Sequence, residues 1–125
     1  MSNTASTAPI HLSAALIVKN EAAKLEACLQ SIAGWVDEIV IVDSGSSDAT
    51  LEIAQKYGAK VYSHTDWQGF GMQRQRAQYH VQGAWVMWLD ADERVTPELK
   101  QSLQAALNQY RDQQNVIFEF NRYSW

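Results

Sequence analysis

The sequence predicts an α/β fold: one Rossmann-like domain with a mostly parallel sheet and helices on both of its faces. Apolar runs of strand length alternate with segments of helical periodicity, and strands joined through helices form parallel, right-handed units. The chain has 125 residues, of which 46% are hydrophobic and 19% charged. This length and composition are typical of a globular domain with a substantial core, and they exclude a disordered chain.

The first half of the chain predicts two strand-helix units. Residues 12–18 are almost continuously apolar, as in a strand that is covered on both faces. Asn20 is the expected N-cap of the helix that follows and that ends before Gly34. Residues 39–42 predict a second buried strand, and a helix over about 49–57 follows a cluster of turn residues. The apolar positions of the first helix recur at helical spacing: Leu25, Cys28, Leu29 and Ile32.

The second half continues the alternation. A short strand at 60–62 leads to an aromatic loop, and a weakly patterned helix then runs to Gly83. Residues 85–89 form the most apolar strand, and a last strand is expected at 116–120. Between these two strands lies a helix that is expected to begin with Thr96 as N-cap and Pro97 at the first helical position. The aromatic loop contains Trp67, Gly69, Phe70 and Gly71, and the stripe of the last helix contains Leu99, Leu103, Ala106, Leu107 and Tyr110.

Charge and cysteine content narrow the classes of function. The net charge is −4 and the Lys and Arg residues are scattered, which argues against a nucleic-acid partner. The single Cys28 cannot form an internal disulfide, so a cytoplasmic setting is the expectation. Residues 1–10 have neither a basic start nor an apolar stretch, and we expect a flexible tail before a domain at 11–125 rather than a signal peptide.

Polar residues follow three of the predicted strands, where ligands bind in parallel sheets. These segments are residues 19–21, 43–44 and 90–93. Two carboxylates about 4 Å apart repel by roughly 4 kcal/mol at an effective dielectric of 20, and a cation relieves that repulsion. Magnesium and manganese bind through one or two protein carboxylates together with substrate phosphates, so the pair Asp90 and Asp92 predicts a metal-diphosphate ligand. An Asp-x-Asp pair by itself is also common in turns.

Three ordered segments resemble the sequence blocks of family 2 glycosyltransferases with the GT-A fold. They are residues 15–21 (ALIVKNE), 41–50 (IVDSGSSDAT) and 88–93 (WLDADE). Residues 70–77 (FGMQRQRA) further resemble the branch that adds sugars, often glucose to heptose, in lipopolysaccharide core assembly. The resemblance extends from Leu12 over nearly the whole chain.

The resemblance implies an inverting, metal-dependent transfer from a nucleotide-diphosphate sugar, often a UDP-sugar, to a glycan or lipopolysaccharide core acceptor. Glu21 and Asp43 would contact the nucleoside, and Arg74 would approach the diphosphate. Asp90 would meet ribose or metal, and Asp92 would ligate Mg²⁺ or Mn²⁺, which stabilises the leaving diphosphate. The donor-binding residues implied in this way are Val18, Asn20, Glu21, Asp43, Ser44, Arg74, Asp90 and Ala91. Such an acceptor implies peripheral association with the cytoplasmic face of the inner membrane.

The sequence departs from the family pattern in two places. Gln75 stands where the family usually has Asn, and Ala84 stands where an acidic residue commonly precedes the strand. The family places its acceptor half and the carboxylate that acts as general base beyond a point equivalent to residue 125. We therefore expect no catalytic base among these residues and no useful sugar transfer by them alone, because such a base contributes about a hundred- to ten-thousand-fold.

Several of these side chains also allow a structural interpretation. Asp48 is expected to cap a helix, whereas a functional role is favoured for Asp43. Trp67 and Phe70 either line a pocket or cover the edge of the core, and both interpretations stay open. The remaining expectations are structural: Trp85 and Trp88 pack in a strand, Arg76 solvates a helix face, and His11, His64 and His80 are surface or loop residues.

Two other classes of protein are considered. Receiver domains of two-component signalling have this length and an acidic, doubly wound sheet, but they need an acidic pair after the first strand. Here that position holds Lys19 and Asn20, and the third strand leads into Ser63 and His64 rather than a phosphorylatable Asp. This class is therefore excluded. A nucleotide-binding or interaction module without transfer activity remains the alternative.

Overall fold

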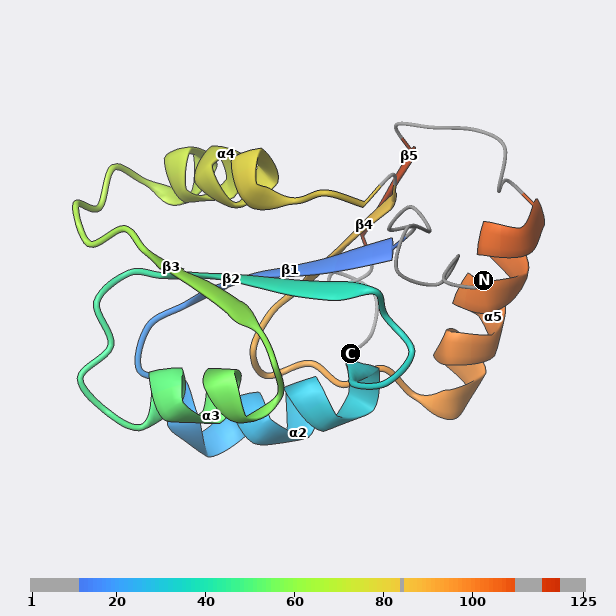
Figure 1. Ribbon diagram of the computed structural model, residues 1–125, viewed down its shortest axis with the longest axis horizontal. Helices are drawn as coiled ribbons and strands as arrows, with labels where there is room; N and C mark the ends of the chain where they lie inside the picture. Colours follow the sequence, from blue (N-terminus) through green and yellow to red (C-terminus); the bar gives the residue numbers. More distant parts are fainter. Residues whose placement is uncertain (1–11, 84, 110–115, 120–125) are drawn as a thin grey trace, which may run out of the picture.

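The computed structural model describes residues 12–83, 85–109 and 116–119, and it confirms the α/β class. Five parallel strands form one sheet in the order β3-β2-β1-β4-β5. Figure 1 shows α4 on one face of this sheet and α2 and α3 on the other. The elements in chain order are β1 (Leu12–Val18), α2 (Ala22–Ile32), β2 (Glu38–Asp43), α3 (Thr50–Lys56), β3 (Lys60–Ser63), α4 (Phe70–His80), β4 (Trp85–Leu89), α5 (Pro97–Gln109) and β5 (Val116–Glu119).

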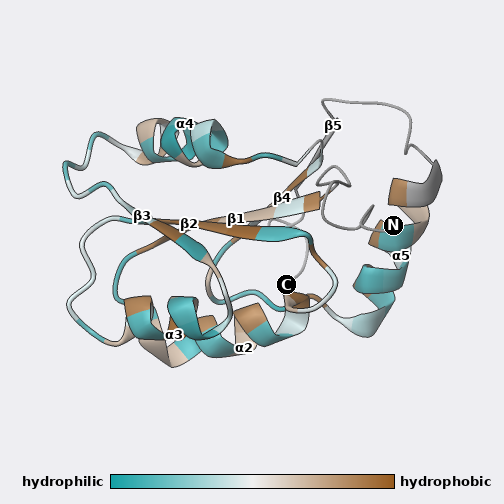
Figure 2. Cartoon of the chain, viewed as in Figure 1, coloured by the Kyte–Doolittle hydropathy of each residue, from teal (hydrophilic) through white to brown (hydrophobic). Residues whose placement is uncertain are grey.

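The central strand β1 is buried on both faces, which explains its continuous apolar sequence. Leu16 pairs with Ile41 of β2 on one side and with Leu89 of β4 on the other. Alternate side chains of the sheet point into two apolar clusters, one on each face. Hydrophobic colour concentrates on the strands in Figure 2.

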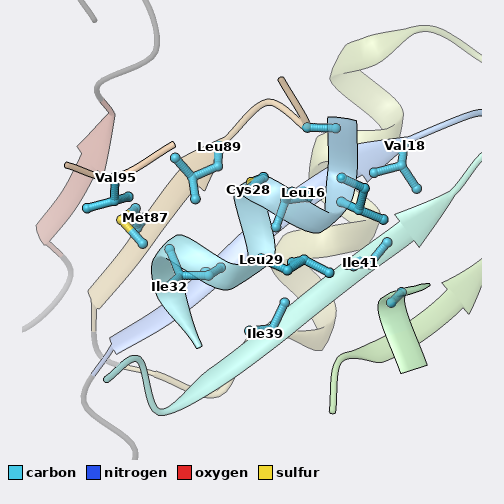
Figure 3. Close-up of a cluster of buried hydrophobic side chains, with 14 of the residues drawn as sticks. Leu16, Val18, Cys28, Leu29, Ile32, Ile39, Ile41, Met87, Leu89 and Val95 are labelled. Carbon is cyan, nitrogen blue, oxygen red and sulfur yellow. The ribbon is translucent and has the colours of Figure 1, made fainter. Parts of the chain in front are cut away.

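The larger cluster receives side chains from the sheet and from α2, α3 and α5. Figure 3 shows its α2 residues against those of the strands. From α2 it receives the four residues that helical spacing predicted, and all four are fully buried: Leu25, Cys28, Leu29 and Ile32. Leu103 of α5 is buried in it, with Leu99 and Leu107 packed alongside. The stripe predicted for α5 is therefore confirmed over these three leucines, and Tyr110 lies outside the described residues. The smaller cluster faces α4, where Ala77 meets Val86 and Trp88. Trp85 is buried in the larger cluster, so both tryptophans of β4 are packing residues as expected.

Some helix ends differ from the prediction. α5 begins as expected, with the Thr96 hydroxyl accepting a hydrogen bond from the Leu99 amide at 3.1 Å. Asn20 does not cap α2, because its backbone is left-handed at φ 54° and Glu21 takes the N-cap position. α4 already begins at Phe70, where a loop was predicted, and ends at His80 because Val81 is extended. Gly69, whose φ is 98°, allows this abrupt start.

A buried carboxylate ties the amino ends of three strands together. The Glu38 carboxylate accepts hydrogen bonds from the Ser13 hydroxyl, from the Gln82 amide at 2.7 Å and from the Lys60 ammonium at 3.0 Å. Burial disfavours its charge, but these three donors outweigh burial and lower the pKa of Glu38. The Gly83 amide also donates to the Ser13 hydroxyl, and a Cβ at residue 83 would lie 2.5 Å from that oxygen. Only glycine fits this position without displacing Ser13.

Within the described ranges, no helix is long and apolar enough to cross a membrane. The expected tail at 1–10 and Ala84 lie outside those ranges.

We predict that Glu38→Gln lowers the free energy of unfolding by about 2 kcal/mol at pH 7, since a buried charged acceptor is lost. A lowered pKa in the folded state means that the wild-type advantage is full above the unfolded pKa and is lost as pH falls through the folded value. The difference in unfolding free energy between the wild type and Glu38→Gln, measured by urea unfolding, should therefore become smaller below about pH 4. Glu26→Gln is the matched control, because the Glu26–Lys56 pair is exposed and screened. Equal effects of the two changes at pH 7 would contradict the prediction.

Candidate functional site

The carboxyl ends of β1, β2 and β4 meet at one edge of the sheet, as the sequence predicts. Val18 at the end of β1 pairs with Asp43 at the end of β2. Leu16 of β1 pairs with Leu89, directly before Asp90. The three polar segments at 19–21, 43–44 and 90–93 therefore follow neighbouring strands, and their loops form one side of the domain.

The loop after β2 is organised by Asp43, which is only 2% exposed. One of its carboxylate oxygens accepts hydrogen bonds from the amides of Gly45 and Ser46, each at 3.0 Å, and the other accepts from the Ser46 hydroxyl. These bonds are those of an Asx turn, so Asp43 has a structural role in forming the turn, in addition to the functional role that the sequence favours. The turn places Ser44, which is also buried, beside the end of β1 through a hydrogen bond from its amide to the Val18 carbonyl at 2.9 Å.

Asn20 joins the loop after β1 to the loop after β2. Its side-chain oxygen accepts a hydrogen bond from the Ser47 amide at 2.7 Å, and its own amide donates to the Ser46 hydroxyl at 2.9 Å. Asparagine tolerates the left-handed backbone that this arrangement requires. Its role is therefore to connect two loops, and this explains why it is not a helix cap.

Asp48 holds the first turns of two helices. Its carboxylate accepts hydrogen bonds from the Thr50 amide at 2.9 Å and from the Ala22 amide at 3.3 Å, and also from the Thr50 hydroxyl. The Thr50 hydroxyl lowers the pKa of Asp48, and the two amides lower it further. Asp48 therefore binds the first amides of α2 and α3, but it is not the N-cap that was expected, because that position of α3 belongs to Ala49.

The acidic loop after β4 exposes two carboxylates above a buried alanine. Asp90 and Asp92 are exposed, whereas Ala91 is 4% exposed and belongs to the core. The loop is closed by two hydrogen bonds, from the Asp90 amide to the Glu93 carboxylate at 2.7 Å and from the Glu93 amide to the Asp90 carbonyl at 3.0 Å. The thiol of Cys28 donates to the Asp90 carbonyl from below at 3.7 Å.

The negative charge of this loop affects Cys28 in the core. Burial, together with the nearby carboxylates of Glu93, Asp92 and Asp90, raises the pKa of the Cys28 thiol to about 12. Three carboxylates of this loop are therefore close enough to the Cys28 thiol to act on it, at the end of β4. Such a concentration of hard oxygen donors suits a divalent cation.

The donor set fits a cation that is shared with a ligand. In the part of the chain that the structure describes, no three His, Cys, Asp or Glu side chains are grouped closely enough to hold a metal ion by themselves. Magnesium and manganese commonly use one or two carboxylates and complete their shell with water and phosphate oxygens. Asp90 and Asp92 are the exposed pair that can supply those carboxylates.

Two cavities open beside these loops. The larger, with a volume of about 480 Å³, lies over the ends of β1 and β2, and the smaller, about 310 Å³, reaches the end of β4. Ile17 and Phe70 line both cavities and so form their common wall. The larger is also lined by Val18, Lys19, Glu21, Ser44, Thr65 and Trp67, and the smaller by Gly71, Arg74, Trp88, Leu89 and Asp90.

Comparison with known proteins identifies the family. A family model described as glycosyl transferase family 2 matches residues 13–123. This chain is a family 2 glycosyltransferase domain. The fold and the enzyme class that the sequence blocks implied are thus confirmed.

The relatives of this family 2 domain are longer proteins. It is 38% identical over 96 residues to a lipopolysaccharide core biosynthesis glycosyltransferase, LpsC, of Rhizobium meliloti, covering 74% of this chain and 35% of the relative. Its fold matches residues 1–349 of S. aureus TarS with a TM-score of 0.71 at 25% identity, over 82% of this chain and 33% of that one. It also matches glucosyl-3-phosphoglycerate synthase of Mycobacterium tuberculosis in complex with Mn²⁺, UDP and glucosyl-3-phosphoglycerate, with a TM-score of 0.58 at 28% identity, over 72% and 37%. The chain spans about a quarter to a little over a third of the length of the curated relatives it matches.

The sequence-predicted donor residues fall into two groups in this family 2 domain. Val18, Glu21 and Ser44 line the larger cavity, and Arg74 and Asp90 line the smaller one. Arg74 lies over the ring of Trp88, with its guanidinium carbon 4.5 Å from the ring centroid. The other residues support the loops: Asn20 and Asp43 shape the two that follow β1 and β2, and Ala91 anchors the acidic loop in the core.

The sequence did not identify a polar network inside α4. Gln73 is completely buried, and its amide nitrogen donates to the Ser44 hydroxyl at 2.7 Å and to the His64 carbonyl at 2.9 Å. Arg76 does not solvate a helix face, as had been expected, because it donates to the Gln73 side-chain oxygen at 2.7 Å and pairs with Asp66 at 2.9 Å. The weak apolar pattern of α4 was the available signal, since polar residues occupy its inward face.

The ring of His80 stacks on that of Tyr62 with centroids 3.5 Å apart. The ring centroid of His64 lies 5.8 Å from that of His80. Burial lowers the pKa of His80, and the neighbouring His64 lowers it further. His11 lies outside the described residues. The two described histidines are half-buried and pack on the outside of β3 and α4.

We predict that Asn20→Ala lowers the free energy of unfolding by about 2 kcal/mol, because alanine loses the bond to Ser47 and is strained in the left-handed region. Asn20→Gly should cost only about 1 kcal/mol, since glycine tolerates that backbone and loses the hydrogen bond alone. Urea unfolding of both variants measures the difference. Equal losses in the two variants would contradict the explanation from backbone strain. No loss in either variant would show that the hydrogen bond to Ser47 contributes nothing to stability either.

Proposed function

We propose that this domain binds the nucleotide-diphosphate sugar, a UDP-sugar, of a metal-dependent inverting glycosyltransferase. The observation that carries the proposal is the pair of adjoining cavities with a common wall, one beside apolar and polar loop residues and the other ending at an exposed acidic loop. A nucleoside suits the first cavity and a charged diphosphate with its cation suits the second. The M. tuberculosis synthase complexed with Mn²⁺ and UDP supports this choice of donor.

In this proposal the loops after β1 and β2 receive the nucleoside. Glu21 and Ser44 offer hydrogen-bonding groups at the wall of the larger cavity, and Val18 with Ile17 offers an apolar surface. Asp43 contributes by holding the turn that presents Ser44. Because these groups are already fixed by hydrogen bonds between the loops, little ordering is needed when the ligand binds.

The diphosphate is placed in the smaller cavity, between Arg74 and the acidic loop. The guanidinium of Arg74 is held against the Trp88 ring, where it can pair with phosphate oxygens. Asp90 and Asp92 would hold Mg²⁺ or Mn²⁺ together with those oxygens. When bound, the cation supplies positive charge that stabilises the leaving diphosphate.

The acceptor is proposed to be a glycan, with the lipopolysaccharide core as the leading candidate. The similarity to LpsC, described as a lipopolysaccharide core biosynthesis glycosyltransferase, supports this choice. Such an acceptor would bring the protein to the cytoplasmic face of the inner membrane as a peripheral partner.

We predict that the chain binds UDP at least about tenfold more tightly in Mn²⁺ than in chelator, a difference of about 1.4 kcal/mol. The reason is that the exposed carboxylates of Asp90 and Asp92 repel a bare diphosphate and attract a metal-bound one. Isothermal titration calorimetry in the two buffers measures the ratio. Equal affinities would remove the metal from the proposal, and no UDP binding in either buffer would overturn the proposed donor site.

We predict that Asp92→Asn reduces UDP affinity in Mn²⁺ by about tenfold or more, since one metal ligand is lost. Affinity in chelator should not fall, because the substitution also removes a charge that repels the bare diphosphate. The fold should persist because Asp92 is exposed. Glu98→Gln is the matched control, because it removes one exposed negative charge from the first turn of α5. A collapsed thermal transition in Asp92→Asn would indicate a structural role, and the same loss in Glu98→Gln would indicate a nonspecific charge effect.

A further inference from the structure

Two exposed aromatic side chains lie together at the larger cavity. Trp67 is 51% exposed and Phe70 is 70% exposed, and their rings meet edge to face with centroids 5.0 Å apart. Both line the cavity, so they do not cover the edge of the core. Exposed aromatic surface beside a pocket is typical of a binding surface.

We propose that Trp67 and Phe70 form the surface on which the nucleobase of the donor packs, and that Asp66, Gln73 and Arg76 are positioning residues for it. This inference rests on the proposed function, because it names the part of the nucleotide that the larger cavity receives.

The first support is the chemistry of the cavity wall. Its lining combines apolar surface from Ile17 and Val18 with polar groups from Lys19, Glu21 and Ser44. A planar group with an apolar face and polar edges suits such a wall, and a nucleobase has both. Phe70 continues into the smaller cavity, where Arg74 and Asp90 provide charged groups for a diphosphate. The order of the two cavities therefore matches the order of base and phosphates in one nucleotide.

The second support is a set of hydrogen-bonded residues behind the aromatic pair, the brace, which consists of Asp66, Gln73 and Arg76. Arg76 donates to the Asp66 carboxylate at 2.9 Å and to the Asp66 carbonyl at 3.3 Å, directly before Trp67 in the chain. The same guanidinium donates to the Gln73 side-chain oxygen, and the Gln73 amide donates to Ser44, which also lines the cavity. One buried glutamine thus connects Ser44 to Arg76 and Asp66, and the loop that carries Trp67 is held in place before any ligand binds.

The central experiment is titration of the full chain with UDP in Mn²⁺. Trp67→Ala should weaken binding by about five- to a hundred-fold, the range for loss of one base-aromatic contact. Trp67→Phe keeps a ring and should keep most of the affinity. Tyr79→Ala is the matched control, because Tyr79 is an aromatic residue of α4 that is 85% exposed and lies beside His64 and His80 at another surface depression. Its affinity for UDP should equal that of the wild type.

A fluorescence measurement separates direct contact from a general change of fold. Saturating UDP should quench the tryptophan emission of the wild type more than that of Trp67→Phe, because stacking brings the base onto the indole of Trp67. Equal quenching in the two proteins would place the base elsewhere and overturn the proposal.

A double-mutant cycle tests the positioning residues. Asp66 is suited to it because its side chain is 65% exposed, so its removal leaves the core untouched. Asp66→Ala should weaken UDP binding at least about twofold in the wild type and have little further effect in Trp67→Ala, since it acts through Trp67. Additive losses would show that the brace does not act through the aromatic pair.

The outcomes distinguish this inference from the proposed function. If the wild type binds no UDP, the proposed donor site fails, and the aromatic assignment fails with it. If the wild type binds UDP and Trp67→Ala binds it equally well, the donor site stands and only the aromatic assignment is overturned.

Discussion

The parallel pairing of β1 with β2 on one side and β4 on the other determines where the loops of the site lie. In this arrangement Val18 stands beside Asp43, and Leu16 stands beside the residue that precedes Asp90. Because β1 is buried on both faces, its register cannot shift without exposing apolar side chains. Core packing therefore holds three polar loops against one another, although their residues lie up to 74 positions apart in the chain, from Lys19 to Glu93.

Within those loops, the polar groups divide into two kinds. Asp43 and Asp48 accept hydrogen bonds from backbone amides, and Asn20 links the loop after β1 to Ser46 and Ser47. Their side chains stabilise the backbone that surrounds the cavity. Asp90 and Asp92 instead remain exposed on a loop anchored by the buried Ala91. A hydrogen-bonded loop that presents charged groups to solvent suits the metal site proposed above, because its ligands would already be placed when a diphosphate binds.

α4 packs against the sheet although its inner face is partly polar. Ala77 alone provides a small apolar contact, and Gln73 is buried with its donors and its acceptor satisfied by Ser44, His64 and Arg76. A buried amide without such partners would destabilise the fold by about 1–3 kcal/mol. The network therefore stabilises the helix and also connects it to the wall of the larger cavity.

The sequence by itself determined the fold class, the order of the elements, the packing leucines of α2 and α5, and the grouping of acidic residues after three strands. These features depend on local periodicity and on the geometry of parallel sheets, which hold for any chain with such a pattern. Only the tertiary structure decided that Asn20 bridges two loops, that Arg76 braces Asp66, and that Trp67 and Phe70 line a cavity. Each of these outcomes depends on a partner distant in sequence or on the course of a loop, and hydropathy along the chain carries no information about such contacts.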